Sequence, residues 1–259
     1  MIEEPYRWVE AIANRREYIE TQLASGNPIA AVSFRDGILF LTVGRTGQKI
    51  FEVYNRIAMG AIGHPGDIER LRMAAIEVAS TEGFTRSAAD VSLRRMAHYS
   101  LSPALKTAFE QIYGPPYLAR LLFAEVGATR EEDLFMRVEY DGAIATNGAT
   151  LSQRHQDYAA LSGTRQSSDL MESYLKSEHT AGSDFKRALT TALDAWSVGH
   201  VALGADAVKE LPEKSAIVKH RQEQLGTAGV EAGILERESK AAIRYRALSD
   251  EDVRSTIGV

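Results

Sequence analysis

Apolar residues in the first part of the chain follow two different periods, one typical of helices and one typical of strands. Four large apolar side chains within residues 6–24 fall near one helical face: Trp8, Ile12, Ile19 and Leu23. This stretch therefore predicts a leading amphipathic helix. Two short apolar runs follow and meet at Asp36 and Gly37, a pair typical of a tight hairpin turn. We expect hairpin strands over 29–35 and 38–43.

The same change of period continues as far as residue 113. A second pair of strands is predicted near 48–53 and 56–62, and a helix over 67–83 follows. A further helical stretch spans about residues 87–113 and contains Pro103. Because proline has no backbone N–H group and clashes with the preceding turn, it should kink or split that helix.

Strand-like runs return after residue 117. The elements predicted for this half are three strands, two helices, a strand pair and a terminal helix, over 118–126, 134–140, 142–146, 164–178, 183–198, 230–237, 241–248 and from residue 250. The three strands at 118–146 imply a further sheet, with a hairpin turn at Asp141 and Gly142. The polar, charged stretch 202–226 predicts an insertion or a long connection with partial helical character at most.

Helix pairs separate the predicted strand groups, and strands do not alternate with single helices. This order favours two mostly antiparallel sheets covered by helices over a parallel βαβ array. The predicted fold is of the α+β class: a four-layer αββα sandwich with an N-terminal amphipathic helix. We interpret residues 1–259 as a single domain, with the leading helix in 1–26, the sandwich in 27–259 and a polar insertion near 202–226.

Composition excludes several kinds of site. The chain has 30 Lys and Arg against 35 Asp and Glu, a formal net charge of −5 that argues against nucleic acid as a partner. No cysteine is present, which excludes a thiol nucleophile. Apolar runs of about six residues are too short to span a membrane, which needs about 20, so a cytoplasmic protein is expected. The six histidines show no ligand spacing, and we expect no metal or cofactor.

Several sequence runs, in their order and spacing, resemble proteasome core-particle subunits. They are "AAVSFRDGILFL", "QKIFEVYNRIAMGAIG", "GDIERLRMAAIEVASTEGF", "PYLARLLFAEVG", "RVEYDGAIA", "YAALSGT" and "VEAGILERESKAAIRYRAL". The leading helix makes the chain similar to the α-type subunits, closest to the actinobacterial kind. This resemblance implies the Ntn-hydrolase fold over nearly the whole chain.

The resemblance also indicates how the chain differs from an active peptidase. In active β-type relatives, a threonine exposed at the start of the first strand is the nucleophile and its own amine is the base. Aligning the hairpin places Asn27 at the nucleophile, Val43 at a helper aspartate and Lys49 near the lysine of that site. Pro28 follows Asn27, and the leader resembles a packed helix more than a removable propeptide. We therefore expect a scaffold without a nucleophile, which is not an enzyme by itself.

The function implied by the resemblance is structural and regulatory. α-type chains form a ring of seven, to which the leading helix with Trp8, Ile12, Ile19 and Leu23 is expected to contribute. The ring caps a β-type protease ring, gates substrate entry and receives an ATPase unfoldase. In α-type relatives a lysine matching Lys49 and a glycine matching Gly63 line the pocket between subunits that meets the ATPase C-terminus.

Two alternatives remain open from the sequence. The first is a self-compartmentalising, proteasome-like threonine peptidase that becomes active after unusual processing, and the mature N-terminus would distinguish it. The second is a homomeric proteasome-like ring with a binding role, favoured if no β-type chain is encoded beside this one. The segment that would form a gate, Met1 to Glu4, is short.

Overall fold

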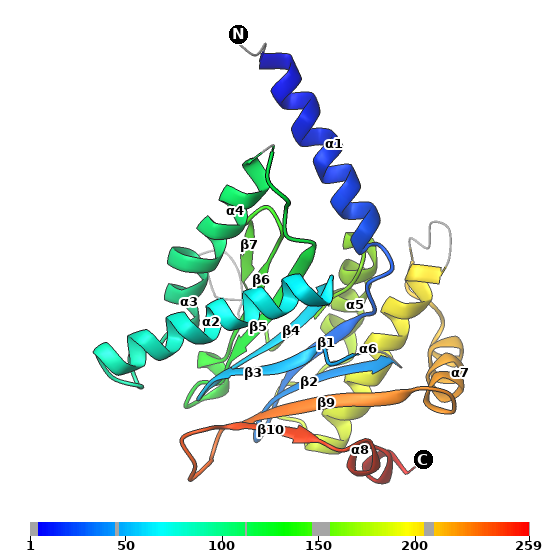
Figure 1. Cartoon of the computed structure of the whole chain (residues 1–259). Coiled ribbons are helices and arrows are strands. Elements are labelled where there is room, and N and C mark those ends of the chain that lie inside the picture. The colour runs from blue at the N-terminus through cyan, green and yellow to red at the C-terminus, as the bar shows by residue number, and fades with distance from the viewer. Residues whose placement is uncertain (1–4, 45–46, 112, 147–155, 205–209, 259) are drawn as a thin grey trace.

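A computed structural model describes residues 5–44, 47–111, 113–146, 156–204 and 210–258 of the chain. Ten strands form two five-stranded antiparallel sheets within this part (Figure 1). The first sheet has the order β10-β9-β2-β1-β8, with strands Tyr245–Leu248, Gly229–Glu236, Gly37–Gly44, Ile29–Phe34 and Tyr158–Leu161. The second has the order β3-β4-β5-β6-β7, with strands Ile50–Tyr54, Ile57–Gly63, Ala119–Glu125, Leu134–Val138 and Ile144–Thr146.

Helices cover the outer face of each sheet (Figure 1). Over the second sheet lie α2 (Pro65–Thr85), α3 (Leu93–Met96), the π-helical turn η1 (Ala97–Leu101) and α4 (Ser102–Glu110). Over the first lie α5 (Arg165–Glu178), α6 (Phe185–Gly204), α7 (Lys214–Leu225) and α8 (Asp250–Ile257). A short 3₁₀ turn, η2 (Arg130–Glu132), precedes β6, and the leading helix α1 spans Pro5–Leu23.

Three buried apolar clusters hold the four layers together. The middle cluster lies between the sheets, where Phe40 of β2 and Leu122 of β5 are fully buried. A second cluster packs the helices α2 to α4 on the second sheet, and a third packs α5 to α8 on the first, with Trp196 1% exposed. Adjacent residues of one strand face different clusters, as the pleat requires. The predicted αββα sandwich is confirmed.

The first hairpin turns one residue earlier than predicted. Phe34 pairs with Gly37, so the two loop residues are Arg35 and Asp36. Gly37 begins β2 instead, where a side-chain Cβ would lie 2.0 Å from the carbonyl oxygen of Leu235 in β9. The glycine is needed because the neighbouring strand approaches closely, and the prediction that it forms the turn was wrong.

The strands are divided between the sheets differently from the prediction. The strands at 118–146 do not form a sheet of their own, because β4 pairs with β5 along its whole length. The hairpin β1–β2 instead pairs with β9 and with β8, Tyr158–Leu161. The sequence prediction missed β8 as a strand. Its four residues are all buried, so no polar alternation marks it.

Pro103 disturbs the predicted long helix without ending it. The helix begins later than predicted, at Leu93, and passes through the π-helical turn before α4, whose first turn contains the proline. The wider hydrogen-bonding pattern just before Pro103 fits the N–H group that proline lacks. The predicted split is therefore a local change of helix type.

The stretch 202–226 is more ordered than predicted. Helix α6 continues through Gly204, and α7 occupies Lys214–Leu225; residues 205–209 lie outside the described part of the chain. Ile217 and Leu225 of α7 are 2% exposed and join the cluster that contains Trp196. The prediction of a largely non-helical insertion was wrong. Two buried residues in a charged sequence are too few to show the apolar period that identifies a helix.

Candidate functional site

Two cavities meet at Lys49, near the start of β1 and β3. Their volumes are about 380 and 530 Å³, and Asn27, Gly47, Gln48 and Lys49 line both. Glu231 and Tyr245 of the first sheet line the smaller cavity. Leu23 of α1 and Gly63 at the end of β4 line the larger one. The structure thus brings Asn27, Lys49 and Gly63 together at these two cavities.

Asn27 is tied to β2 by its side-chain amide. Its Nδ2 donates to the carbonyl oxygen of Val43 and lies 3.5 Å from Oγ1 of Thr42, which donates to the carbonyl of Pro28 at 2.7 Å. The side chain of Val43 is 1% exposed and packs in the core between the first sheet and its helices. The residue that directs its side chain towards Asn27 is therefore Thr42, which the sequence analysis did not single out.

A carboxylate from a distant strand holds the backbone at Lys49. Glu231 of β9 accepts hydrogen bonds from the backbone N–H of Lys49 at 2.9 and 3.0 Å and from that of Ile50 at 2.7 Å. Burial lowers the pKa of Lys49, and the charge of Glu231 opposes that shift only in part. Burial likewise raises the pKa of Glu231, against the hydrogen bonds from Ile50 and Lys49. The sequence contains no signal for Glu231, which is 182 residues away.

Gly63 occupies a position that only glycine fits. Its φ is +128°, and a Cβ there would lie 2.0 Å from the carbonyl oxygen of Leu118. The next residue, His64, donates its backbone N–H to that same carbonyl at 2.8 Å. The glycine therefore permits the close pairing of β4 with the chain entering β5, and it leaves the wall of the larger cavity without a side chain.

Helix α1 is packed at one end and projects at the other (Figure 1). Ile19 and Leu23 are at most 1% exposed and pack with Phe109 and Tyr140. Ile12 is half-buried against the same cluster, whereas Trp8 is 43% exposed. Within the described chain, the apolar face predicted from the sequence is thus only half covered.

A buried ionic network fixes the packed end of α1. Arg120 of β5 is 1% exposed and forms ion pairs with Glu20 at 2.5 Å and Glu139 at 2.8 Å. The hydroxyl of Tyr140 donates to Glu20 at 2.7 Å. Burial alone would raise the pKa of Glu20, but the hydrogen bonds from Tyr140 and Arg120 outweigh it and lower the pKa. The sequence analysis did not single out Arg120. A single charge inside the apolar run "LARLLF" is the feature of the sequence that indicates a buried, paired arginine.

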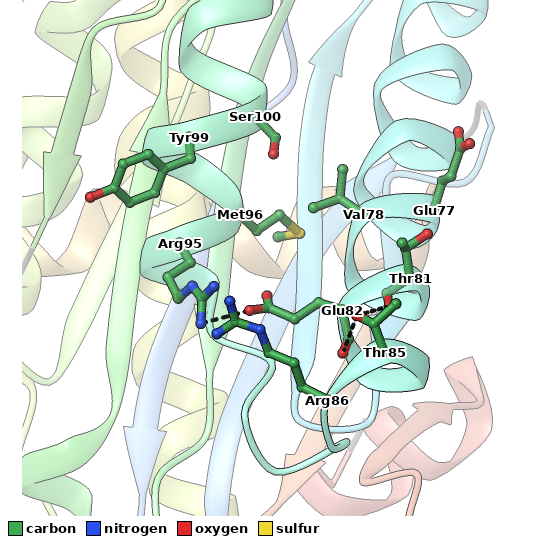
Figure 2. Close-up of a pocket in the computed structure, with 10 residues that line it drawn as sticks. All are labelled: Glu77, Val78, Thr81, Glu82, Thr85, Arg86, Arg95, Met96, Tyr99 and Ser100. Carbon is green, nitrogen blue, oxygen red and sulfur yellow. Dashed lines mark hydrogen bonds and ion pairs between the residues drawn. The ribbon is translucent and has the colours of Figure 1, made fainter.

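A separate groove lies between α2 and the α3–η1 segment, away from all the predicted site residues (Figure 2). Its volume is about 740 Å³, and Glu82, Arg86, Arg95 and Tyr99 are among its lining residues. Glu82 and Arg95 form an ion pair at 2.8 Å across it. No histidine is among the residues that line this groove.

The sequence is similar to several proteasome subunits over most of its length. It is 31% identical to the proteasome subunit alpha of Parafrankia sp. strain EAN1pec over 192 residues, which cover 73% of this chain and 74% of that protein. The chain belongs to the proteasome α-subunit family. The family resemblance inferred from the sequence, including its actinobacterial character, is confirmed.

Longer alignments cover more of this α subunit. It is 29% identical to the proteasome subunit alpha of Frankia casuarinae over 230 residues, which cover 88% of the chain and 85% of that protein. Identity to the corresponding protein of Streptomyces coelicolor is 28% over 237 residues, covering 90% and 89%. No protein-family model matches the chain. Within the described residues, no helix is long and apolar enough to cross a bilayer.

Proposed function

We propose that this α subunit assembles with further α-type chains into a ring of seven that caps a β-type proteasome ring. The ring would limit substrate entry and receive a ring-shaped ATPase unfoldase. The observation that carries this proposal is the half-covered face of α1. Trp8 is 43% and Val9 66% exposed on a helix whose other end is locked by buried contacts. A rigid, projecting apolar surface of this kind is typical of a subunit interface.

We further propose that residues 1–259 act as one domain. The middle cluster packs the two sheets against each other, and α1 packs on α4 and on the chain after β6 through Phe109 and Tyr140. Because each sheet is buried on both faces, neither half of the sandwich would keep its core alone.

The surroundings of Asn27 support a role without catalysis. An amide nitrogen of Asn27 is occupied by β2, and the side chain of Val43 faces away from it into the core. A threonine peptidase of this fold needs a terminal hydroxyl and amine at that point. A carboxamide within the chain supplies neither group, so we propose that the subunit is a non-catalytic part of a threonine-type endopeptidase complex.

The cavities at Lys49 are the proposed docking point for the ATPase. The lysine stands where two recesses meet, with the side-chain-free position of Gly63 in the wall of the larger one. A neighbouring α-type chain would complete the pocket. An ammonium group at its mouth would form a charge-assisted hydrogen bond with the terminal carboxylate of a partner chain.

Native mass spectrometry tests the proposed assembly. The purified chain, alone and co-expressed with its candidate β-type partner, should give a ring of α-type chains or a stacked particle that contains both chains. A chain that stays monomeric under both conditions would contradict the proposal. A ring that never accepts a β-type chain would instead favour a homomeric ring with a binding role.

Catalytic silence is a second expected result. The purified chain should not cleave small fluorogenic peptides, because Asn27 has a carboxamide where the chemistry needs a terminal threonine, and the side chain directed towards it is that of Thr42 and not an aspartate. An epoxyketone directed at terminal threonines should leave its intact mass unchanged, with the residues before Asn27 retained. Covalent labelling of this chain, or a mature chain that starts near Asn27, would favour the peptidase alternative.

A further inference from the structure

Two of the scattered histidines meet between neighbouring helices. His200 near the end of α6 and His220 in α7 face each other with Nδ1 of the first 3.0 Å from Nε2 of the second. Both imidazoles are half-buried. Trp196 stacks on His200 with ring centroids 4.8 Å apart and lies 6.1 Å from His220. The sequence showed no such pair, because the two residues are 20 positions apart on different helices.

The separation of the two ring nitrogens also suits a shared metal ion. A contact of this length needs a lone pair on at least one nitrogen, and in the neutral imidazoles both can present one. With metal–nitrogen bonds of about 2.0–2.1 Å, nitrogens at this separation subtend about 91–97° at the ion. That angle fits the square-planar or tetragonal sites of Cu²⁺ and Ni²⁺ better than the tetrahedral sites of Zn²⁺.

Water would have to complete the coordination of an ion held by this pair. Among the described residues no group of three or more His, Cys, Asp or Glu side chains gathers as a ligand set, so two imidazoles would bind and water would complete the shell. The nearby carboxylate of Asp194 already pairs with Arg221 at 2.6 Å.

We propose that His200 and His220 form a two-imidazole site for a divalent transition-metal ion, with affinity in the order Cu²⁺, Ni²⁺, Zn²⁺. The ion replaces the hydrogen bond between the rings and joins α7 to α6. This site is separate from the proposed ring and docking surfaces and does not depend on them.

Tryptophan fluorescence gives a direct test, because Trp196 stacks on one of the ligands and the chain contains only two tryptophans. In a Trp8→Phe background, titration with Cu²⁺ should quench Trp196 saturably at one ion per chain. Ni²⁺ should displace the bound Cu²⁺ only at a higher concentration, and Zn²⁺ only at a concentration higher still. His200→Gln and His220→Gln should each weaken Cu²⁺ binding at least tenfold.

His98→Gln is the matched control, because His98 is exposed on η1 and should not affect the titration. Electron paramagnetic resonance of Cu²⁺ bound to the unmutated chain should show two nitrogen ligands, and this measurement does not require the variants to fold. Quenching that survives in the His200→Gln, His220→Gln double variant would overturn the proposal. So would a spectrum without imidazole nitrogen, which would leave the pair as a hydrogen bond only.

Discussion

Replacement of Trp8 by serine should abolish ring assembly while the single chain keeps its fold. Trp8 lies on the projecting part of α1 and is 43% exposed, so its loss removes little from the core of its own chain. Tryptophans at the centre of an interface typically contribute about 2–4 kcal/mol to binding. Because a ring repeats the same contact at each interface, a loss of this size should dissociate it.

Size-exclusion chromatography with light scattering, together with thermal unfolding, measures both parts of this expectation. Wild type should elute as a ring and Trp8→Ser as smaller species, with the free energy of unfolding of the dissociated chain within about 0.5 kcal/mol of an unmutated monomer. Phe84→Ser is the control, because Phe84 is 92% exposed on α2. Intact rings in Trp8→Ser would show that the exposed end of α1 has another role.

The position of a truncation matters for the same reason. Removal of residues 1–11 should act like Trp8→Ser, because it takes away the projecting turns and keeps Ile12, which packs against the buried cluster. Removal of residues 1–24 also takes away Ile19 and Leu23 from their cluster and Glu20 from the buried Arg120. Arg120 keeps its ion pair with Glu139, but the deletion exposes the apolar cluster and leaves the Tyr140 hydroxyl and one guanidinium N–H of Arg120 without their acceptor. That longer deletion should therefore destabilise the sandwich itself.

Substitution of Lys49 by alanine should weaken docking of the ATPase about tenfold to a hundredfold per site, because a charge-assisted hydrogen bond contributes about 1.5–3 kcal/mol when partly desolvated. Avidity around the ring should multiply the loss. Ring assembly should stay near wild type and thermal stability should fall only slightly, because Glu231 keeps its hydrogen bonds from the backbone N–H groups of residues 49 and 50 when the ammonium is lost. Lys176→Ala, on the exposed surface of α5, is the matched control.

A double-mutant cycle identifies the group that Lys49 meets. Surface plasmon resonance would compare wild type and Lys49→Ala against a partner C-terminus that is free or amidated. If the ammonium binds that carboxylate, each change alone should weaken binding and the two together should add little more. Strictly additive losses would show that Lys49 does not contact the carboxylate.

The affinity of docking should fall as the pH rises above neutral. Burial lowers the pKa of Lys49 against the partial opposition of Glu231, so its ammonium loses a proton at lower pH than an exposed lysine does. Docking should therefore be strongest at neutral pH and weaken as the pH rises, earlier than for a pair that uses an unperturbed lysine. Lys49→Ala should lose this alkaline dependence along with the affinity.

Local periodicity predicted the helices and strands whose apolar residues repeat with a clear helical or strand period. α2, α5 and the strands of the first two hairpins appear within a few residues of the predicted bounds, because each has an apolar face of the right period. The four-layer order also followed, since helix pairs between strand groups leave few other arrangements. The family resemblance supplied Lys49 and Gly63, which the structure places in one cavity wall.

Contacts between distant parts of the chain were decided only by the tertiary structure. Strand pairing joins β1 to β8 and β4 to β5, and no local pattern records which edge a strand will choose. The partners of the site are equally remote: Glu231 at Lys49 and Glu20 at Arg120. Such pairs form because burial leaves a charged or backbone group needing a partner, and only the folded chain determines which one lies within reach.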